Sequence, residues 1–198
     1  SPVAAQTYIF LSNAVLQAPE PPGFPAAWGN TAADYEMDAN IVLDPQYIGQ
    51  VKSALLSLPS MSIVMAIEDL FDAKTGIYAN PNNSGVSWER PGSVELIYPD
   101  GAKGFQVNCG VRMQGAYFRS PWACRKHSFR LVFKGKYGPT KLRYPLFGDD
   151  AAGEFDTLVL RAGANDGYTW SGNETNAQFT RDEFVRSLQH DTGNAASH

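Results

Sequence analysis

The sequence predicts an α+β fold, in which a mainly antiparallel sheet is flanked by helices. The 198 residues include 18 Gly and 13 Pro, which favours many turns between moderate-length strands over a helical bundle. Residues 86–98 and 105–114 are strand-like segments joined by a turn that contains Asp100-Gly101, a dipeptide typical of hairpins. Apolar residues recur with helical spacing over residues 45–58 and 177–189.

The first elements of the chain divide it into two parts. Residues 7–11 are an apolar run expected to form a short strand, and residues 17–30 are a Pro- and Gly-rich loop. We therefore separate residues 1–40, an N-terminal strand with a linker region, from the main domain at residues 41–198. The main domain opens with a helix that Asp44 and Pro45 start and Pro59 ends.

The remaining elements alternate between strands and short helices. Strands are expected at residues 62–67, 127–133, 141–145 and 155–161, with a helical turn at 68–71. The last helix carries an apolar stripe. Thr180 and Glu183 have the spacing of a capping box at its start. The stripe consists of Ala177, Phe184, Val185 and Leu188.

Positive charge is concentrated in one block, Gly101 to Gly148. These 48 residues contain ten Lys and Arg and no Asp or Glu, whereas the whole chain has 16 bases and 20 acids. Such separation creates a local field that attracts anions, from phosphates to acidic glycans. The block is therefore the expected location of a functional site. Its bases are Lys103, Arg112, Arg119, Arg125, Lys126, Arg130, Lys134, Lys136, Lys141 and Arg143.

Composition argues against several classes of protein. A net charge of −4 and a pI near 5.3 disfavour a general nucleic-acid binder. No apolar run reaches the roughly 18 residues of a membrane span. The two Cys and three His lack any recognised metal-ligand spacing. Cys109 and Cys124 are expected either to form a disulfide, if the protein is exported, or to be two buried thiols.

Strand alternation divides the basic block into an apolar face and a polar face. If segments 105–114 and 127–133 are neighbours, their polar side chains converge on one surface. The connecting loop, Gly115 to Arg125, adds Arg119 and Ser120. Backbone N–H groups, hydroxyls and an ammonium group in this arrangement suit phosphate binding. The other interpretation is an ordinary solvated sheet face. The converging residues are Arg112, Gln114, Lys126, Ser128 and Arg130.

Several segments, in order, resemble the spore-coat protein H (CotH) kinase family, in particular its large secreted bacterial members. They are ERPGSVELIYPDG, then GFQVNCGVRMQGAYFRSPWACRKHSFRLVFKGKYGPTKLRYPLFGDD, FDTLVLRAGANDGYTW and TRDEFVRSLQHDTG. The resemblance implies an atypical protein-kinase-like fold that transfers phosphate from ATP, with Mg²⁺, to Ser or Thr of a protein. It implies that Lys126 contacts the nucleotide and that Gly115 to Ser120 cover its phosphates. One departure is Gln114-Gly115, where Arg-Gly is common.

The resemblance has further implications for the rest of the site. The chain is expected to be the N-terminal portion of the kinase domain of an exported protein, with the catalytic and metal-binding acids in a later lobe. No catalytic residue is therefore assigned here. Asp182 and Glu183 are candidates to pair with the kinase lysine, or are exposed capping residues. The loop at residues 165–170 has acids, amides and aromatic rings suited to substrate contact, or is an ordinary loop.

A non-enzymatic interpretation remains open beside the kinase. A secreted β-rich module with this basic face would bind acidic polysaccharide or another cell-surface polyanion. Tyr117, Trp122 and Trp170 would then stack on sugar rings. The two interpretations differ in whether ATP is a ligand.

Overall fold

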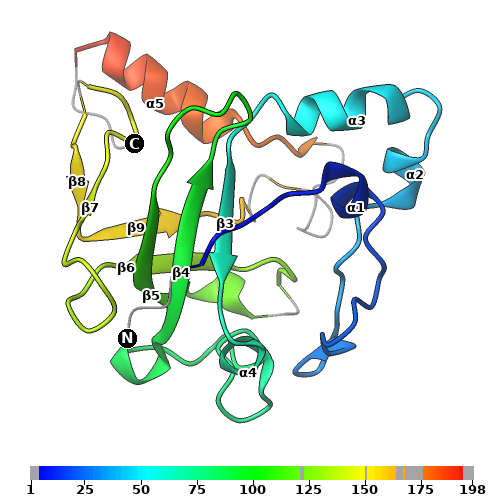
Figure 1. Ribbon diagram of the computed structural model, residues 1–198, viewed down its shortest axis with the longest axis horizontal. Helices are drawn as coiled ribbons and strands as arrows, with labels where there is room; N and C mark the ends of the chain where they lie inside the picture. Colours follow the sequence, from blue (N-terminus) through cyan, green and yellow to red (C-terminus); the bar gives the residue numbers. More distant parts are fainter. Residues whose placement is uncertain (1–4, 121–122, 150, 164–166, 168–175, 194–198) are drawn as a thin grey trace.

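A five-stranded antiparallel sheet forms the centre of the computed structural model (Figure 1). The structure describes residues 5–120, 123–149, 151–163, 167 and 176–193. The sheet order is β3-β4-β5-β6-β9, and every neighbouring pair is antiparallel. The predicted α+β class is thus confirmed. The strands are β3 Ser60–Val64, β4 Arg90–Ile97, β5 Gln106–Gln114, β6 Ser128–Val132 and β9 Thr157–Leu160.

Short helices and two small ribbons surround this sheet. Figure 1 shows α1, α2 and α3 grouped at one side of the molecule. The helices are α1 Leu11–Val15, α2 Ala39–Val42, α3 Ile48–Leu55, α4 Ile67–Phe71 and α5 Arg181–Asp191, with 3-10 turns at Val86–Trp88 and Tyr117–Arg119. The ribbons pair β1 Ala27–Trp28 with β2 Thr31–Ala32, and β7 Leu142–Arg143 with β8 Glu154–Phe155.

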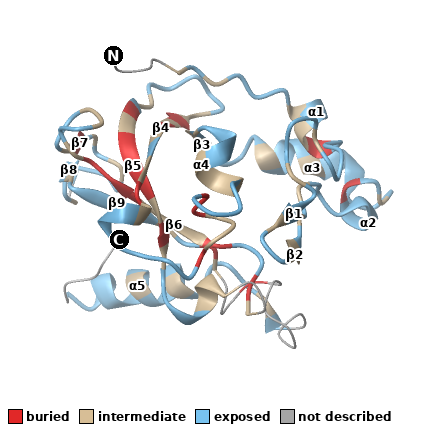
Figure 2. Ribbon diagram, turned by 90° about the horizontal axis from the view of Figure 1, so that it is seen from below, coloured by how far each residue is buried: buried red, intermediate tan, exposed pale blue. Residues whose placement is uncertain are grey.

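One face of the sheet holds the apolar core. Val94, Val111 and Leu131 are fully enclosed there, because alternate residues of β4, β5 and β6 point to the same side. Ile77 joins this core, and Leu70 of α4 packs against it. Figure 2 shows the buried residues concentrated on β5. The alternation predicted for residues 105–114 and 127–133 is confirmed, so their polar residues occupy the opposite face.

The N-terminal strand expected at residues 7–11 is wrong. Leu11 begins α1, and Thr7 bonds to the sheet, donating from its backbone N to Glu95 at 2.7 Å and from its hydroxyl to Ser62 at 2.7 Å. A short apolar run fits a helix or a strand equally well, and tertiary contacts choose between them. The strand expected at 141–145 is the two-residue β7, which lies outside the main sheet.

The two predicted long helices exist, but they begin later than expected. α3 starts at Ile48 because the Asp44 carboxylate accepts from Gln46 N at 2.7 Å and closes a turn before the helix. α5 starts at Arg181, and Thr180 makes no side-chain capping bond, so the predicted capping box does not form. The stripe residues Phe184 and Leu188 are exposed. No helix within the described ranges is long and apolar enough to cross a membrane.

Candidate functional site

The polar residues of β5 and β6 lie side by side, as the alternation predicted. Arg112 pairs with Arg130, and Gln114 pairs with Ser128, across neighbouring strands. Arg130 Nε donates to Gln114 Oε1 at 2.8 Å. The Ser128 hydroxyl accepts from Ala162 N at 2.9 Å, which ties β6 to the segment that follows β9. Two guanidinium groups therefore occupy adjacent positions on the polar face.

A buried carboxylate immediately before β4 organises part of the basic block. The Glu89 side chain is fully enclosed and ion-pairs with Arg112, with Lys134 at 2.9 Å and with Lys136 at 3.0 Å. Tyr137 donates its hydroxyl to the same carboxylate at 2.8 Å. We call Glu89, Arg112, Lys134, Lys136 and Tyr137 the Glu89 cluster. It brings one anion and three cations together on the polar face.

The electrostatics of the Glu89 cluster keep its carboxylate ionised. Burial alone would raise the pKa of Glu89, but hydrogen bonds from Lys134, Lys136, Tyr137 and Arg112 outweigh it and lower the pKa to about 2. The bonds from Lys136 to Tyr137 and Glu89 raise the pKa of the Lys136 ammonium. Glu89 could not be recognised from the sequence as part of the site. It lies before the acid-free block, in the segment 86–98 that was predicted only to form a strand.

Tertiary pairing divides the ten bases of the block into two groups. Glu89 pairs with three of them. Lys141 and Arg143 pair with Glu154, and Arg125 lies 3.8 Å from Asp34. Four bases form no ion pair with the described residues: Lys103, Arg119, Lys126 and Arg130. The last three lie in β6 or in the segment that joins β5 to β6. The uncompensated positive charge is therefore concentrated at one end of this hairpin.

The loop after β5 is anchored to a neighbouring loop. Gly115 has φ +106°, a conformation that L side chains rarely adopt, and the 3-10 turn Tyr117–Arg119 follows it. Arg119 Nη1 donates to Asn83 O at 3.1 Å, and the Ser120 hydroxyl donates to Asn82 Oδ1 at 3.2 Å. The buried Nε of Arg119 has no hydrogen-bond partner in the described structure. This N–H is therefore an unused donor within the predicted phosphate-covering loop.

The strand that follows Lys126 begins one residue later than expected. β6 begins at Ser128, so Lys126 occupies an exposed position two residues before the strand. The Sγ of Cys124 donates to the backbone carbonyl of Lys126 at 2.9 Å. This bond fixes the backbone at Lys126 but leaves the lysine side chain in solvent. The adjacent His127 is buried. Burial lowers the pKa of its imidazole, and a hydrogen bond with Phe118 O partly opposes that shift.

Cys109 and Cys124 are both buried and both free. Cys109 lies at the centre of β5 on the core face, whereas Cys124 is a buried residue of the segment between β5 and β6. Of the two states expected for these cysteines, a disulfide or two buried thiols, the structure has the two buried thiols. Burial raises the pKa of the Cys109 thiol to about 12.

Asp182 and Glu183 do not meet a lysine of the site. Asp182 forms an ion pair with Arg161, the residue after β9, and Glu183 lies 3.8 Å from Arg186 on the same helix. No described carboxylate forms an ion pair with Lys126. Within the predicted substrate loop at 165–170, only Gly167 belongs to the described residues, and it is buried. Trp122 and Trp170 also lie outside the described ranges.

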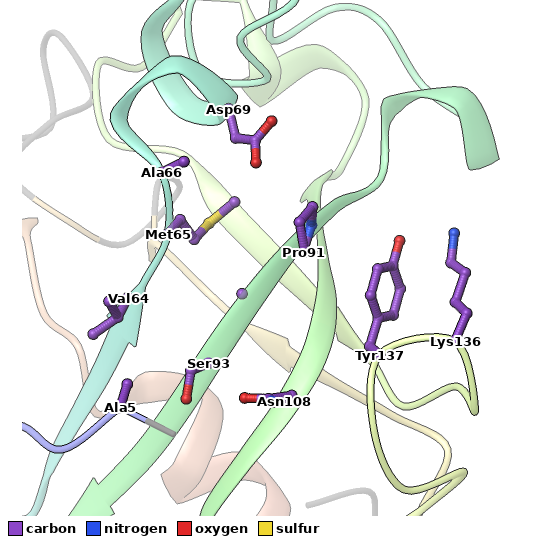
Figure 3. Close-up of a pocket in the computed structure, with 11 residues that line it drawn as sticks. Ala5, Val64, Met65, Ala66, Asp69, Pro91, Ser93, Asn108, Lys136 and Tyr137 are labelled. Carbon is purple, nitrogen blue, oxygen red and sulfur yellow. The ribbon is translucent and has the colours of Figure 1, made fainter. Parts of the chain in front are cut away.

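A pocket of about 480 Å³ adjoins the Glu89 cluster, at the start of β4 (Figure 3). Its apolar wall includes Val64, Met65 and Pro91. Tyr137 and Lys136 stand together at the right of the view, across from Val64 and Met65. Both side chains also bond to Glu89, so the pocket and the buried carboxylate share a wall.

The described residues contain no group of three or more His, Cys, Asp or Glu arranged to hold a metal ion. The geometry defines an α+β domain whose basic side chains are partly neutralised and partly free at one hairpin end. Comparison with protein-family models, with curated proteins and with solved structures found no match for this chain.

Proposed function

We propose that this chain is the nucleotide-phosphate-binding part of a CotH-like atypical protein kinase. The observation that supports the proposal is the separation of the basic block into paired and unpaired cations. Arg119, Lys126 and Arg130 have no carboxylate partner among the described residues. Arg119 and Lys126 lie in the segment between β5 and β6, and Arg130 lies in β6. A polyphosphate supplies the negative charge that the described residues do not provide there.

The donors at this hairpin end match the needs of a phosphate group. Arg130 uses Nε for Gln114, and Arg119 uses Nη1 for a carbonyl, so both guanidinium groups retain N–H donors. Lys126 adds an ammonium on a flexible stem, which acts as a point charge. Gly115 leaves the backbone without a side chain where the loop turns away from β5.

ATP is the proposed ligand, with Mg²⁺ as the ion that accompanies it in kinases. The cations described above fit the phosphates, whereas no described cluster fits the metal. The proposal therefore assigns residues to the phosphates only and assigns no step to Mg²⁺. The protein substrate would supply a Ser or Thr hydroxyl. Phosphorylation of exported or coat proteins is the function that the resemblance favours.

The test is nucleotide binding by this chain, measured with a fluorescent ATP analogue. Lys126→Met should weaken binding about tenfold, because one charge-assisted contact is worth roughly 1.4 kcal/mol. Lys103→Met is the matched control, since Lys103 is exposed and lacks a described ion pair but lies in the turn between β4 and β5. It should leave nucleotide affinity unchanged.

The rival function predicts a different pattern in the same variants. Acidic-polysaccharide binding predicts similar losses of heparin affinity for both substitutions, a steep dependence on salt and no competition by ATP. Unchanged nucleotide affinity in Lys126→Met would remove this lysine from the proposed site. Absence of nucleotide binding by the unaltered chain would contradict the proposed function.

A further inference from the structure

A polar groove of about 980 Å³ separates the β1–β2 ribbon from the loop that follows α4. Its volume is near the upper end of the range for ligand sites, about 300–1,000 Å³. Its lining includes the side chains of Trp28, Asn30, Thr31, Asn82, Asn83 and Arg125. All residues that line this groove belong to the described parts of the chain.

The groove shares a wall with the proposed phosphate-binding loop. Ser120 donates to Asn82 Oδ1 at 3.2 Å, and Arg119 donates to the Asn83 carbonyl at 3.1 Å. Arg125, at the other end of the same loop, lines the groove directly. A molecule that lies in the groove is therefore adjacent to the loop that would hold the terminal phosphate of a nucleotide.

The chemistry of the lining suits an extended peptide. Asn30, Asn82 and Asn83 each carry a carboxamide, which donates and accepts hydrogen bonds as a peptide group does. Thr31 adds a hydroxyl. No Asp or Glu is among the described residues that line the groove, and Arg125 is its one charged residue. The lining thus combines backbone-like hydrogen bonding with a single positive charge.

Arg125 is available to a carboxylate on that peptide. Its side chain is 60% exposed and lies 3.8 Å from the Asp34 carboxylate, which is itself 52% exposed. An exposed ion pair of this kind contributes less than about 1 kcal/mol. A well-placed acidic side chain in the groove competes with Asp34, because a bidentate Arg–carboxylate contact is stronger.

Trp28, the aromatic residue of the lining, is held in a fixed position by neighbouring aromatic rings. The Trp28 ring stacks on Phe71 at an interplanar angle of 12°, and Tyr35 and Tyr78 approach it edge-on. Its indole N–H donates to the Tyr35 hydroxyl at 2.8 Å. These contacts hold the ring within an aromatic cluster, so the carboxamides and Arg125 dominate recognition. This arrangement favours a peptide over a sugar chain that stacks on aromatic rings.

We propose that the groove binds an extended peptide segment with a Ser or Thr near an acidic residue, and that Arg125 selects the acidic residue. The role of this segment as the phosphate acceptor rests on the proposed function. In that role, its hydroxyl oxygen bonds to the γ-phosphorus of ATP. The bond from that phosphorus to ADP breaks, and the hydroxyl proton passes to solvent.

Fluorescence anisotropy of labelled peptides tests this site with the 198-residue chain itself. One short peptide carries Ser flanked by Glu, and a second carries Ser flanked by Lys. Arg125→Glu should weaken binding of the Glu peptide about tenfold and should favour the Lys peptide. Ala73→Trp, which fills the groove from an exposed position, should weaken the Glu peptide without reversing the preference.

Lys103→Glu is the matched control for Arg125→Glu. Both positions are exposed, and both backbone carbonyls accept a tyrosine hydroxyl, from Tyr144 for Lys103 and from Tyr78 for Arg125. The control should leave peptide affinity unchanged. Circular dichroism of each variant should match that of the unaltered chain.

The outcomes separate this inference from the proposed function. Equal affinity for both peptides, or affinity that neither Arg125→Glu nor Ala73→Trp changes, overturns the peptide site. Heparin binding that Ala73→Trp weakens, with no binding of either peptide, assigns the groove to a glycan and also overturns it. Glu-peptide binding by a chain that fails to bind the ATP analogue supports the groove and contradicts the proposed function and the acceptor role.

Discussion

Gly110 lies directly beneath the buried side chain of Glu89. A Cβ atom at residue 110 would be 2.8 Å from Glu89 Cγ and 2.5 Å from Tyr137 Cε2. Real Cβ atoms do not approach other heavy atoms this closely, so the carboxylate occupies its position only because β5 has glycine there. The Glu89 cluster thus depends on the glycine at residue 110, which leaves room for the carboxylate, as well as on its cations.

Gly110→Ala should destabilise the fold by about 2 kcal/mol, because the methyl group forces Glu89 and Tyr137 apart in a packed site. Urea denaturation followed by circular dichroism measures the effect. Gly49→Ala is the control, since no atom lies within 4 Å of the Cβ position in this α3 residue. That control should be stabilising by roughly 0.5–1 kcal/mol. Equal stability of the Gly110 variant and the unaltered chain would contradict the packing described here.

Glu89→Gln should destabilise the fold by about 3 kcal/mol, because three cations lose the anion that compensates them. The Gln side chain has nearly the same shape as that of Glu, so the loss of stability reports on the loss of the negative charge. Glu154→Gln is the comparison: Glu154 also pairs with two bases of the block, but its side chain is half exposed, and the change should be small. Similar effects of the two substitutions on the urea midpoint would rule out a special role for burial.

The depressed pKa of Glu89 predicts a specific acid sensitivity. Its carboxyl has an ordinary pKa of 4.5 when unfolded and a pKa of about 2 when folded. The stability that Glu89 contributes, about 3 kcal/mol, is fully present above pH 4.5 and is lost as the pH falls towards 2. The free energy of unfolding, measured across this window, should fall less steeply in Glu89→Gln than in the unaltered chain. Parallel curves would contradict the ionised, buried carboxylate.

Both thiols should be unreactive in the native protein. Cys109 and Cys124 are free and buried, and burial raises the pKa of Cys109 to about 12. A thiolate-specific reagent such as Ellman's should therefore react slowly with native protein purified without reductant. In guanidinium chloride it should detect both of the chain's two cysteines. Detection of no thiol after unfolding would restore the disulfide alternative.

Local pattern predicted the β4–β5 pair and the division of β5 and β6 into a polar and an apolar face. The Asp100-Gly101 turn predicted that β4 and β5 pair, and the alternation predicted which side chains share a face. The register that places Arg112 beside Arg130 is known only from the structure. The apolar pattern gave the wrong secondary structure in the short segment at residues 7–11. The run at 7–11 lacks a sheet partner that would hold it as a strand, so residue 11 begins a helix instead.

The sequence by itself determined that ten bases are concentrated in one stretch, because composition is independent of folding. Only the tertiary structure decided which of those bases are free. Glu89 and Asp34 come from outside the stretch and are brought to it by chain packing, so no count along the sequence reveals the pairing. Ion pairs depend on distances of a few ångströms between residues far apart in the chain, and those distances exist only in the folded protein.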